Sequence, residues 1–337
     1  MNILFFDLRE SEKAFFERNN YKKIYPEFEI TFKEDALTDN TKLNNEEYEK
    51  TCILCVYRSS ILTEKVLKKF KNLRMIATRS HGFTHIDLDY CVKNRINVIN
   101  VEQYGEEAVA EFALGVIIDL TRNIKTAMLD IRNKNINPKK YEGELLNKKT
   151  IGIIGCGKVG VKLAKIARFF DMNVLVSSYK DIPQFEKFCN VVPFDKLLAE
   201  SDIIYLHMPF TTENYQIIGK DEFKKMKDGV YIVNTSSVEL LNLKALYENL
   251  KTRKVHGAGL DILESDYKKG KTSSALGGET MSTTENYKIS EKLLEMPNVL
   301  ITPHLAYNTV EYIDYVLETL FNNIRDNIKG NYTNRVC

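Results

Sequence analysis

Short runs of apolar residues alternate with longer amphipathic segments along almost the whole chain. The runs are rich in Ile, Val, Leu and Phe, as is typical of strands that are buried on both faces. Because segments of helical periodicity separate them, the pattern predicts parallel sheets built from βαβ units. In the first part of the chain the predicted strands are Ile3–Phe6, Phe28–Phe32, Cys52–Val56, Arg74–Thr78 and Asn97–Asn100.

A long helical pattern, from about Glu106 to Asn123, leads to a second series of strands that begins at Thr150. A last helical pattern, from about Val310 to Ile328, has no strand after it. We therefore expect this helix to return to the first domain and to close it. The second series of predicted strands comprises Ile151–Ile154, Val174–Val176, Ile203–Leu206, Val230–Val233, His256–Leu260 and Val299–Ile301.

The two series predict an α/β fold of two doubly wound parallel-sheet domains, one flavodoxin-like and one Rossmann, with a cleft between them. At 337 residues the chain is too long for one ordinary core. We assign residues 1–102 and 305–337 to the first domain and residues 103–304 to the second. The polar stretch 265–290 is longer than most loops, which predicts a mobile lid or a poorly ordered insertion.

Composition excludes several classes of partner. The formal net charge is +2, without a long basic run, so we expect neither nucleic acid nor anionic lipid as a partner. No stretch is apolar enough for a secretory signal or a membrane span. Cys52 and Cys55, three apart on a predicted strand, are expected on opposite faces and thus not to share a metal or a disulfide. Reduced cysteines and the lack of a targeting segment favour the cytoplasm.

The first strand of the second series leads into a glycine-rich turn and an amphipathic helix. Such a strand–GxGxxG–helix unit predicts a dinucleotide site. The first glycine permits a tight turn, the second lets the backbone approach the pyrophosphate, and the third lets the helix pack on the strand, while the helix N-terminus faces the phosphates. The motif residues are Gly155, Cys156, Gly157, Lys158, Val159 and Gly160.

The acidic residue that usually binds the adenosine ribose is missing. Ser178 stands at the expected position, with Lys180 nearby and Asp181 three residues later. A carboxylate there would repel the 2′-phosphate of NADP, whereas Ser with Lys180 tolerates it. We therefore predict NAD or NADP as the cofactor, with NADPH accepted.

Six further segments flank the glycine motif along the chain: residues 78–87, 104–111, 207–209, 233–236, 257–261 and 302–304. In this order, and together with the glycine motif, they resemble the D-2-hydroxyacid dehydrogenase family over nearly the whole chain. The D-lactate dehydrogenase branch is the most similar, because Tyr104 stands where that branch has a substrate-contacting tyrosine.

The resemblance implies NAD(P)-dependent hydride transfer between the nicotinamide and C2 of a 2-keto or 2-hydroxy acid. It implies His304, in Thr-Pro-His at a strand end, as the acid/base, because imidazole gives and takes a proton near neutral pH. The carboxylate partner of this histidine is expected at Asp266, with Glu264 as the alternative. The carboxylate of the substrate is expected on the backbone amides near His81 and Gly82.

One residue departs from the family pattern. The arginine that binds the substrate carboxylate is expected at position 237, where this chain has Ser237. Loss of a guanidinium removes a strong charge-assisted contact, which serine does not replace. Two interpretations stay open. In the first, the protein is an enzyme in which another group, such as protonated His81, supplies the charge, or whose substrate has changed. In the second, the protein binds the cofactor but is catalytically impaired and serves as a sensor or interaction module.

Other predictions rest on the same resemblance. The helix after Glu106 resembles the family's dimer-forming segment, so we expect a homodimer. Arg79 is interpreted as structural, holding the loop that binds the carboxylate. Further cofactor contacts are expected at His207, Pro209, Thr235 and Asp261.

Overall fold

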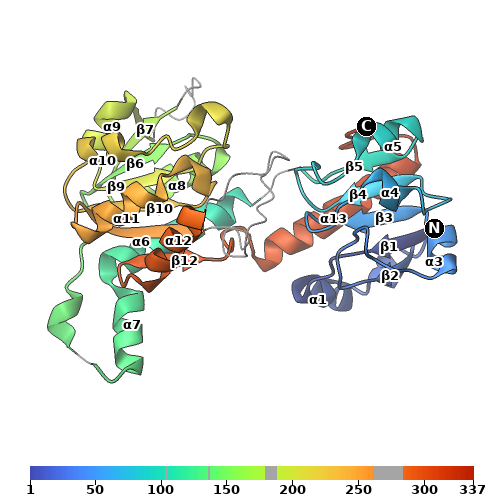
Figure 1. Cartoon of the computed structure of the whole chain (residues 1–337), viewed down its shortest axis with the longest axis horizontal. Helices are drawn as coiled ribbons and strands as arrows, with labels where there is room; N and C mark the ends of the chain where they lie inside the picture. The colour runs from blue at the N-terminus through green and yellow to red at the C-terminus, as the bar shows by residue number, and fades with distance from the viewer. Residues whose placement is uncertain (103–104, 136, 179–187, 262–283) are drawn as a thin grey trace. The chain divides into compact units, whose positions relative to one another are not determined.

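The computed structural model describes residues 1–102, 105–135, 137–178, 188–261 and 284–337 (Figure 1). The chain divides into two compact units. Of the described residues, unit 1 contains 1–102 and 308–337, and unit 2 contains those within 105–261 and 284–307. Each unit has a parallel sheet of its own, so the predicted α/β class with two parallel-sheet domains is confirmed.

The sheet of unit 1 has the flavodoxin-like strand order β2-β1-β3-β4-β5, and every neighbouring pair is parallel. All five predicted strands are present, each within one residue of its predicted ends. Their bounds are β1 (Asn2–Phe5), β2 (Glu29–Phe32), β3 (Ile53–Val56), β4 (Met75–Thr78) and β5 (Asn97–Ile99).

Helices cover both faces of this sheet. The last helix, α13, packs its apolar side against α1 and one face of the sheet, with Leu317, Leu320 and Phe321 fully buried there. α4 and α5 contribute to a second cluster on the other face. The helices of unit 1 are α1 (Glu10–Arg18), α2 (Tyr21–Ile24), α3 (Asn45–Lys50), α4 (Glu64–Leu67), α5 (Leu88–Lys93) and α13 (Val310–Ile328).

The sheet of unit 2 has the order β12-β11-β10-β9-β6-β7-β8 and is also parallel throughout. The strand order reverses between β6 and β9, and ligands of such sheets bind beyond the carboxyl ends of the strands at this reversal. The strands are β6 (Thr150–Ile154), β7 (Asn173–Ser177), β8 (Asn190–Val191), β9 (Ile203–Leu206), β10 (Val230–Asn234), β11 (Val255–Asp261) and β12 (Val299–Thr302).

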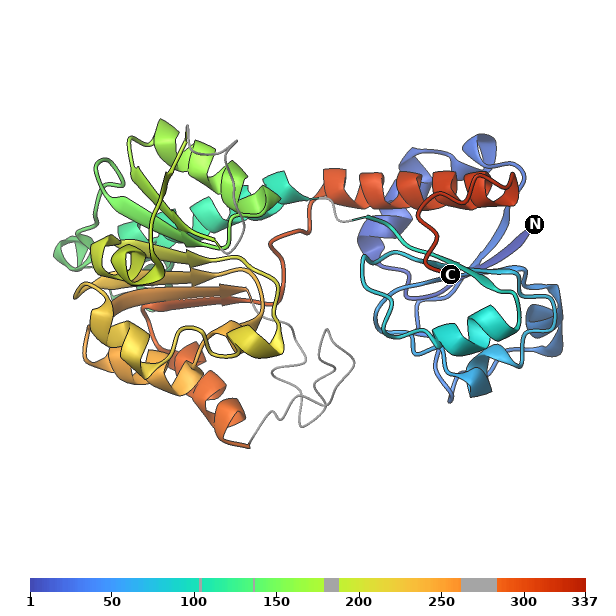
Figure 2. The same cartoon turned by 90° about the horizontal axis from the view of Figure 1, so that it is seen from above.

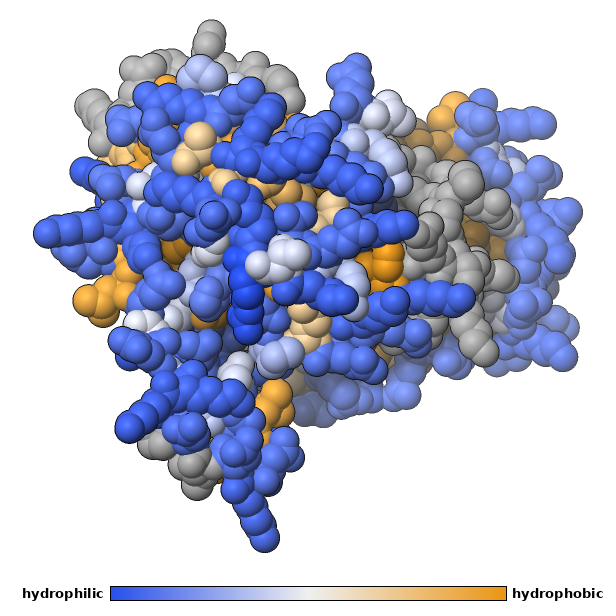
Figure 3. All heavy atoms as spheres, turned by 60° about the vertical axis from the view of Figure 1, so that its left-hand side comes forward, coloured by the Kyte–Doolittle hydropathy of each residue, from blue (hydrophilic) through white to orange (hydrophobic). Residues whose placement is uncertain are grey.

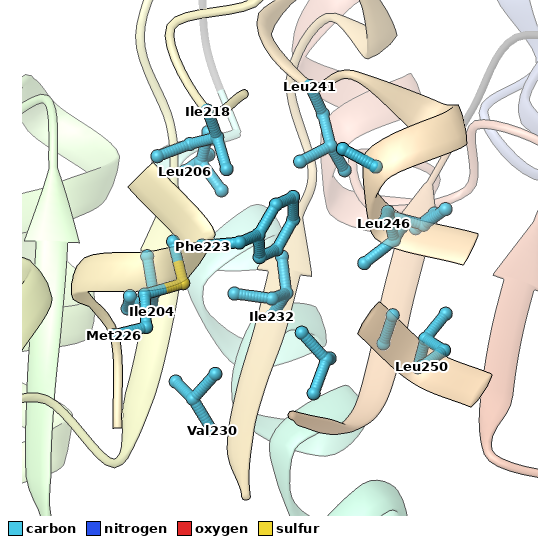
Figure 4. Close-up of a cluster of buried hydrophobic side chains, with 14 of the residues drawn as sticks. Ile204, Leu206, Ile218, Phe223, Met226, Val230, Ile232, Leu241, Leu246 and Leu250 are labelled. Atoms are coloured by element: carbon cyan, nitrogen blue, oxygen red, sulfur yellow. The ribbon is translucent and has the colours of Figure 1, made fainter. Parts of the chain in front are cut away.

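Two layers of helices enclose this sheet, as Figure 2 shows. Along β9, Ile203 and Tyr205 face one layer while Ile204 and Leu206 face the other, where Phe223 fills the centre of the cluster in Figure 4. α6 (Glu106–Arg122) and α8 (Lys158–Phe169) form the first layer. The second layer comprises α9 (Phe194–Glu200), α10 (Lys220–Lys225), α11 (Leu243–Lys251) and α12 (Thr284–Glu295).

The predicted loop 265–290 requires a correction at its end. Residues 262–283 lie outside the described part of the chain, but α12 begins at Thr284, so the last residues of the stretch are helical. Ile289 and Leu293 are buried against the core of unit 2, and this packing stabilises a segment that is otherwise polar.

The prediction that Cys52 and Cys55 lie on opposite faces of a strand was wrong. Cys52 precedes β3, and both Cys52 and Cys55 pack against the same apolar cluster. All six cysteines are free thiols, and burial raises the pKa of Cys55 to about 12.

Hydrophilic residues predominate on the face of the molecule in Figure 3. None of the helices that the structure describes is long and apolar enough to cross a membrane.

Candidate functional site

The glycine-rich turn follows β6, at the point where the strand order of unit 2 reverses. Gly155 has φ +92, and a Cβ there would lie 2.5 Å from the carbonyl oxygen of His207. A Cβ on Gly160 would lie 2.7 Å from the carbonyl oxygen of Gly155. Backbone fills both positions, so the turn excludes any side chain at Gly155 and Gly160.

Gly157 differs from these two glycines, because a Cβ added there would meet no described atom within 4 Å. Packing inside the protein therefore does not require glycine at this position, but a ligand that approaches the backbone would. Gly157 is the N-cap of α8, and in the described part of the chain no side chain caps this helix. The helix N-terminus and the bare backbone at Gly157 thus fit the pyrophosphate of a dinucleotide.

A hydrogen-bonded network lies at the carboxyl ends of β9 and β10. The Nδ1 atom of His207 lies 3.1 Å from the hydroxyl of Tyr205 and 3.2 Å from that of Thr235, and the two hydroxyls are 2.6 Å apart. Burial lowers the pKa of His207 to about 4, so the imidazole is neutral at pH 7. A neutral ring fixed by two hydroxyls suits a binding role beside a cofactor better than proton transfer.

His304 lies in a tight turn that Asp261 holds in place. Asp261 ends β11, and its buried carboxylate accepts hydrogen bonds from the Thr302 hydroxyl (2.6 Å) and from the amides of Leu305 (2.7 Å) and Ala306 (2.8 Å). His304 itself has φ +55, a strained conformation for a residue other than glycine. Such a conformation persists only where surrounding contacts enforce it. The three hydrogen bonds that the Asp261 carboxylate accepts do so here.

The contacts of Asp261 bear on its predicted role. We expected this residue to bind the cofactor, whereas the structure shows its carboxylate bonded to the segment around His304. Asp261 pairs with Thr302 across the neighbouring strands β11 and β12. Two residues of adjacent parallel strands at the same level bring the Asp close to the turn that follows the Thr.

Ser237 lies in the loop after β10, a half-buried serine at the start of a short 3-10 helix, Val238–Leu240. The amide side chain of Asn234 orders this loop by donating to the Ser237 carbonyl (2.9 Å) and accepting from the Ser236 backbone amide (2.9 Å). The adjacent Glu239 is acidic. This loop therefore brings no positive charge to the carboxyl end of β10.

In unit 1 the loop after β4 carries His81 and Gly82. Ser80 is buried, and its hydroxyl donates to the Gly82 carbonyl (2.6 Å) and lies 2.8 Å from that of Thr78. His81 is exposed, and a Cβ on Gly82 would meet nothing within 4 Å, so the backbone here is open to a ligand.

Arg79, in the same loop, is fully buried and bonded within the protein. Its guanidinium pairs with the buried Glu12 at 2.8 Å and donates to the carbonyls of Phe6 (2.9 Å) and Asp7 (3.0 Å). The guanidinium thus ties the loop after β4 to the loop after β1, as a structural residue would.

Several predicted residues lie outside the described part of the chain or show no contact relevant to a ligand. Tyr104, Lys180, Asp181, Glu264 and Asp266 lie outside it. Ser178 follows β7, and Pro209 is exposed in the loop after β9. Cys156 is buried, and Lys158 pairs with Glu106 of α6 at 3.0 Å. In the described residues, no group of three or more His, Cys, Asp or Glu side chains is arranged to hold a metal.

Comparison with known proteins agrees with this geometry. Residues 114–306 match the family described as D-isomer specific 2-hydroxyacid dehydrogenase, NAD binding domain. An aromatic 2-oxoacid reductase of Clostridium sporogenes is 34% identical over 283 residues, which cover 81% of this chain and 82% of that protein. The chain belongs to the D-isomer-specific 2-hydroxyacid dehydrogenase family. It is an oxidoreductase of the NAD-dependent D-2-hydroxyacid dehydrogenase type, and its cofactor is NAD.

Solved structures support the same assignment over the full length. The apo-structure of D-lactate dehydrogenase from Escherichia coli superposes with a TM-score of 0.86 at 29% identity and covers 100% of both chains. The D-lactate dehydrogenase from Aquifex aeolicus, in complex with NAD and lactic acid, has a TM-score of 0.76 at 30% identity and covers 98% of this chain and 96% of that chain. Both units therefore follow the architecture of the family.

Proposed function

We propose that the protein reduces a 2-oxo acid to the D-2-hydroxy acid with NADH, using His304 as the acid/base. The observation that carries this proposal is the turn around His304, which Asp261 holds through three hydrogen bonds at the carboxyl end of the NAD-binding sheet. The similar proteins, an aromatic 2-oxoacid reductase and a D-lactate dehydrogenase, support a small 2-oxo acid as the substrate.

The residues of this chain divide the work as follows. When bound, the nicotinamide supplies the hydride that C2 of the substrate receives. The imidazole of His304 donates a proton to the carbonyl oxygen of the substrate and recovers it from solvent. On sequence grounds, Asp266 or Glu264 holds the imidazolium, and Tyr104 contacts the side chain of the substrate. Unit 2 binds the cofactor, and unit 1 binds the carboxylate on the backbone near His81 and Gly82.

Relaxed cofactor specificity is part of the proposal. Ser178 follows β7 at the position where a carboxylate would repel a 2′-phosphate. We therefore expect NADPH to bind within tenfold of NADH. Titration of both reduced cofactors, followed by the change in their own nicotinamide fluorescence, measures this ratio, and NADPH binding more than tenfold weaker would contradict it.

Ser237 supports a second candidate function, a cofactor-binding homologue without useful turnover that acts as a sensor or interaction module. The loop after β10 has no cation for a substrate carboxylate, which is the observation in its favour. The ordered turn around His304 favours the enzyme, since a protein without turnover has no need of a strained, pinned histidine. The rate of Ser237→Arg with pyruvate separates the two. A rise would show that the missing cation limits turnover, as the second candidate requires.

Assembly and location are proposals of the same kind. A homodimer is supported by α7 (Ile124–Arg132), none of whose residues is buried. Its exposed apolar side chains are Ile124, Met128, Leu129 and Ile131. The free cysteines are compatible with a reducing compartment such as the cytoplasm.

Initial rates of NADH oxidation across a panel of 2-oxo acids, from glyoxylate and pyruvate to branched, aromatic and acidic ones, test the proposal. We expect turnover with at least one member and a loss of at least 100-fold in kcat for His304→Gln with NADH binding unchanged. No turnover with any member, while NADH still binds, would favour the second candidate.

A further inference from the structure

A reductase of 2-oxo acids needs a cation for the substrate carboxylate, and the loop at Ser237 has none. Charge-assisted contacts to carboxylates are among the strongest polar contacts in proteins, and their loss in a closed site weakens both binding and turnover. The rest of the acid/base turn is well ordered in unit 2. The positive charge must therefore come from another cation of the chain, one with no structural task.

The topology of unit 1 indicates where a ligand would bind. The strand order reverses between β1 and β3, and in such sheets ligands bind beyond the carboxyl ends of the strands at this point. Phe5 pairs with Cys55, and Val56 pairs with Thr78, so the loops after β1, β3 and β4 begin at nearly the same level. The backbone amide of Tyr57 donates to the Asp7 carboxylate at 3.1 Å, which joins the first two of these loops.

Most charges at this edge of the sheet are compensated inside the protein. Arg79 and Glu12 form the buried pair described above. The Asp7 carboxylate accepts from Tyr57 and from the hydroxyls of Ser59 and Ser60. Arg9 stacks on the Tyr57 ring, with the guanidinium carbon 4.1 Å from the ring centroid. These groups build the edge and are not available to a ligand without breaking it.

Arg58 follows β3 in the same edge and differs from them. Its side chain is exposed, and it makes no hydrogen bond or ion pair with any described residue. Its positive charge acts on His85 in the loop after β4, whose pKa is lowered first by burial and then by Arg58. Because Val56 and Thr78 are paired at the ends of β3 and β4, Arg58 follows the same edge of the sheet as the loop that contains Ser80 and Gly82.

The nearby His85 does not replace it. Burial and the charge of Arg58 lower the pKa of His85 to about 4, so this ring is neutral at pH 7. The Nε2 atom of His85 lies 3.2 Å from the Thr78 hydroxyl, inside the hydrogen-bonded base of the loop. His81 is exposed and belongs to the loop itself.

We propose that Arg58 supplies the positive charge that holds the carboxylate of the 2-oxo acid, in place of an arginine at position 237. This assignment rests on the proposed function. The guanidinium of Arg58 pairs with the carboxylate, and the open backbone at Gly82 receives the second carboxylate oxygen. The binding charge has thus moved from the cofactor-binding unit to unit 1.

Arg58→Gln tests the assignment, with Arg74→Gln as the matched control. Arg74 is also an exposed arginine of unit 1, but it precedes β4 at the amino end of the same sheet. The readouts are the KM values for pyruvate and phenylpyruvate and the Kd for NADH. We expect at least a tenfold rise in both KM values for Arg58→Gln, partial recovery in Arg58→Lys, and no change in NADH binding. Arg74→Gln should match the wild type.

Binding of oxamate, an unreactive analogue of pyruvate, to the NADH-loaded protein separates the two proposals. If the wild type turns over 2-oxo acids and Arg58→Gln has the KM of Arg74→Gln, the function stands and the assignment of Arg58 is wrong. If the wild type has no turnover but Arg58→Gln weakens oxamate binding tenfold, the function fails and the assignment stands. The assignment of Arg58 would be overturned if Arg58→Gln raised the KM only for 2-oxo acids with a second carboxylate. It would also be overturned if the wild type did not bind oxamate.

Discussion

Asp261 shows how one carboxylate determines the geometry of the turn that contains the proposed acid/base, His304. Its oxygens accept three hydrogen bonds from a segment that lies more than 40 residues away in the chain. The sequence predicted His304 as the acid/base, but no local pattern announces bonds between residues so distant. The glycines are the opposite case. Gly155 and Gly160 are required by backbone contacts within one turn, so their motif was readable directly.

Asp261→Asn tests the positioning role. An amide offers one acceptor oxygen in place of two, so it does not satisfy all three donors. We expect a loss of about 1–3 kcal/mol in the free energy of unfolding and at least a tenfold fall in kcat. Asp202→Asn is the control, because Asp202 accepts from the Thr150 amide at the amino end of its sheet. It should lose stability with kcat retained, and equal kcat values for the two variants would contradict the positioning role.

The two histidines with a pKa of about 4, His85 and His207, make stability depend on pH. In the unfolded chain their pKa is about 6.5, so the unfolded state binds more protons between pH 6.5 and 4. We therefore expect the urea midpoint to fall as the pH is lowered through this window. His207→Asn should flatten the fall, and a slope equal to that of the wild type would show that His207 is already protonated when folded.

At the scale of elements, the hydrophobic pattern was sufficient wherever a strand is buried on both faces. The strand Ile203–Leu206 has its predicted bounds, and so does the helix Val310–Ile328, which has a continuous apolar side. The pattern did not reveal β8, which has two exposed residues, or the start of α12, where only tertiary packing stabilises a polar segment. The exposed helix α7 was also missed, since its apolar side chains do not point into a core.

The glycine-rich turn yields a prediction at this scale. Gly157→Ala should fold with wild-type stability, because a Cβ there has open space, but should weaken NADH binding at least tenfold by obstructing the approach of the pyrophosphate. Gly160→Ala should instead destabilise the fold, because its Cβ would meet the backbone of Gly155. Thermal unfolding and NADH titration distinguish them. Normal NADH binding by Gly157→Ala would place the pyrophosphate elsewhere.

At the scale of the whole molecule, family membership and the two parallel sheets agree with what the order of motifs predicted. The resemblance did not explain the missing arginine at position 237. That question depends on which charges are compensated, and compensation is visible only once the strand ends of unit 1 are assembled. Arg58 had no motif to distinguish it in the sequence.

The proposed homodimer is tested at this scale by Ile131→Asp. Ile131 is 58% exposed on α7, and a charge there should block association without disturbing the core. Light scattering should show a dimer for the wild type and a monomer for the variant. Val92→Asp, at a 62% exposed position of unit 1, should remain dimeric. A dimeric Ile131→Asp protein would exclude α7 as the centre of the interface.

The chirality of the product shows whether the protein reduces a 2-oxo acid to the D-2-hydroxy acid. Purified protein, NADH and the best substrate of the panel are allowed to react, and the 2-hydroxy acid is resolved on a chiral column. We expect one D-2-hydroxy acid to form for each NADH consumed. An L product, or NADH binding with no 2-hydroxy acid formed from any substrate, would contradict it.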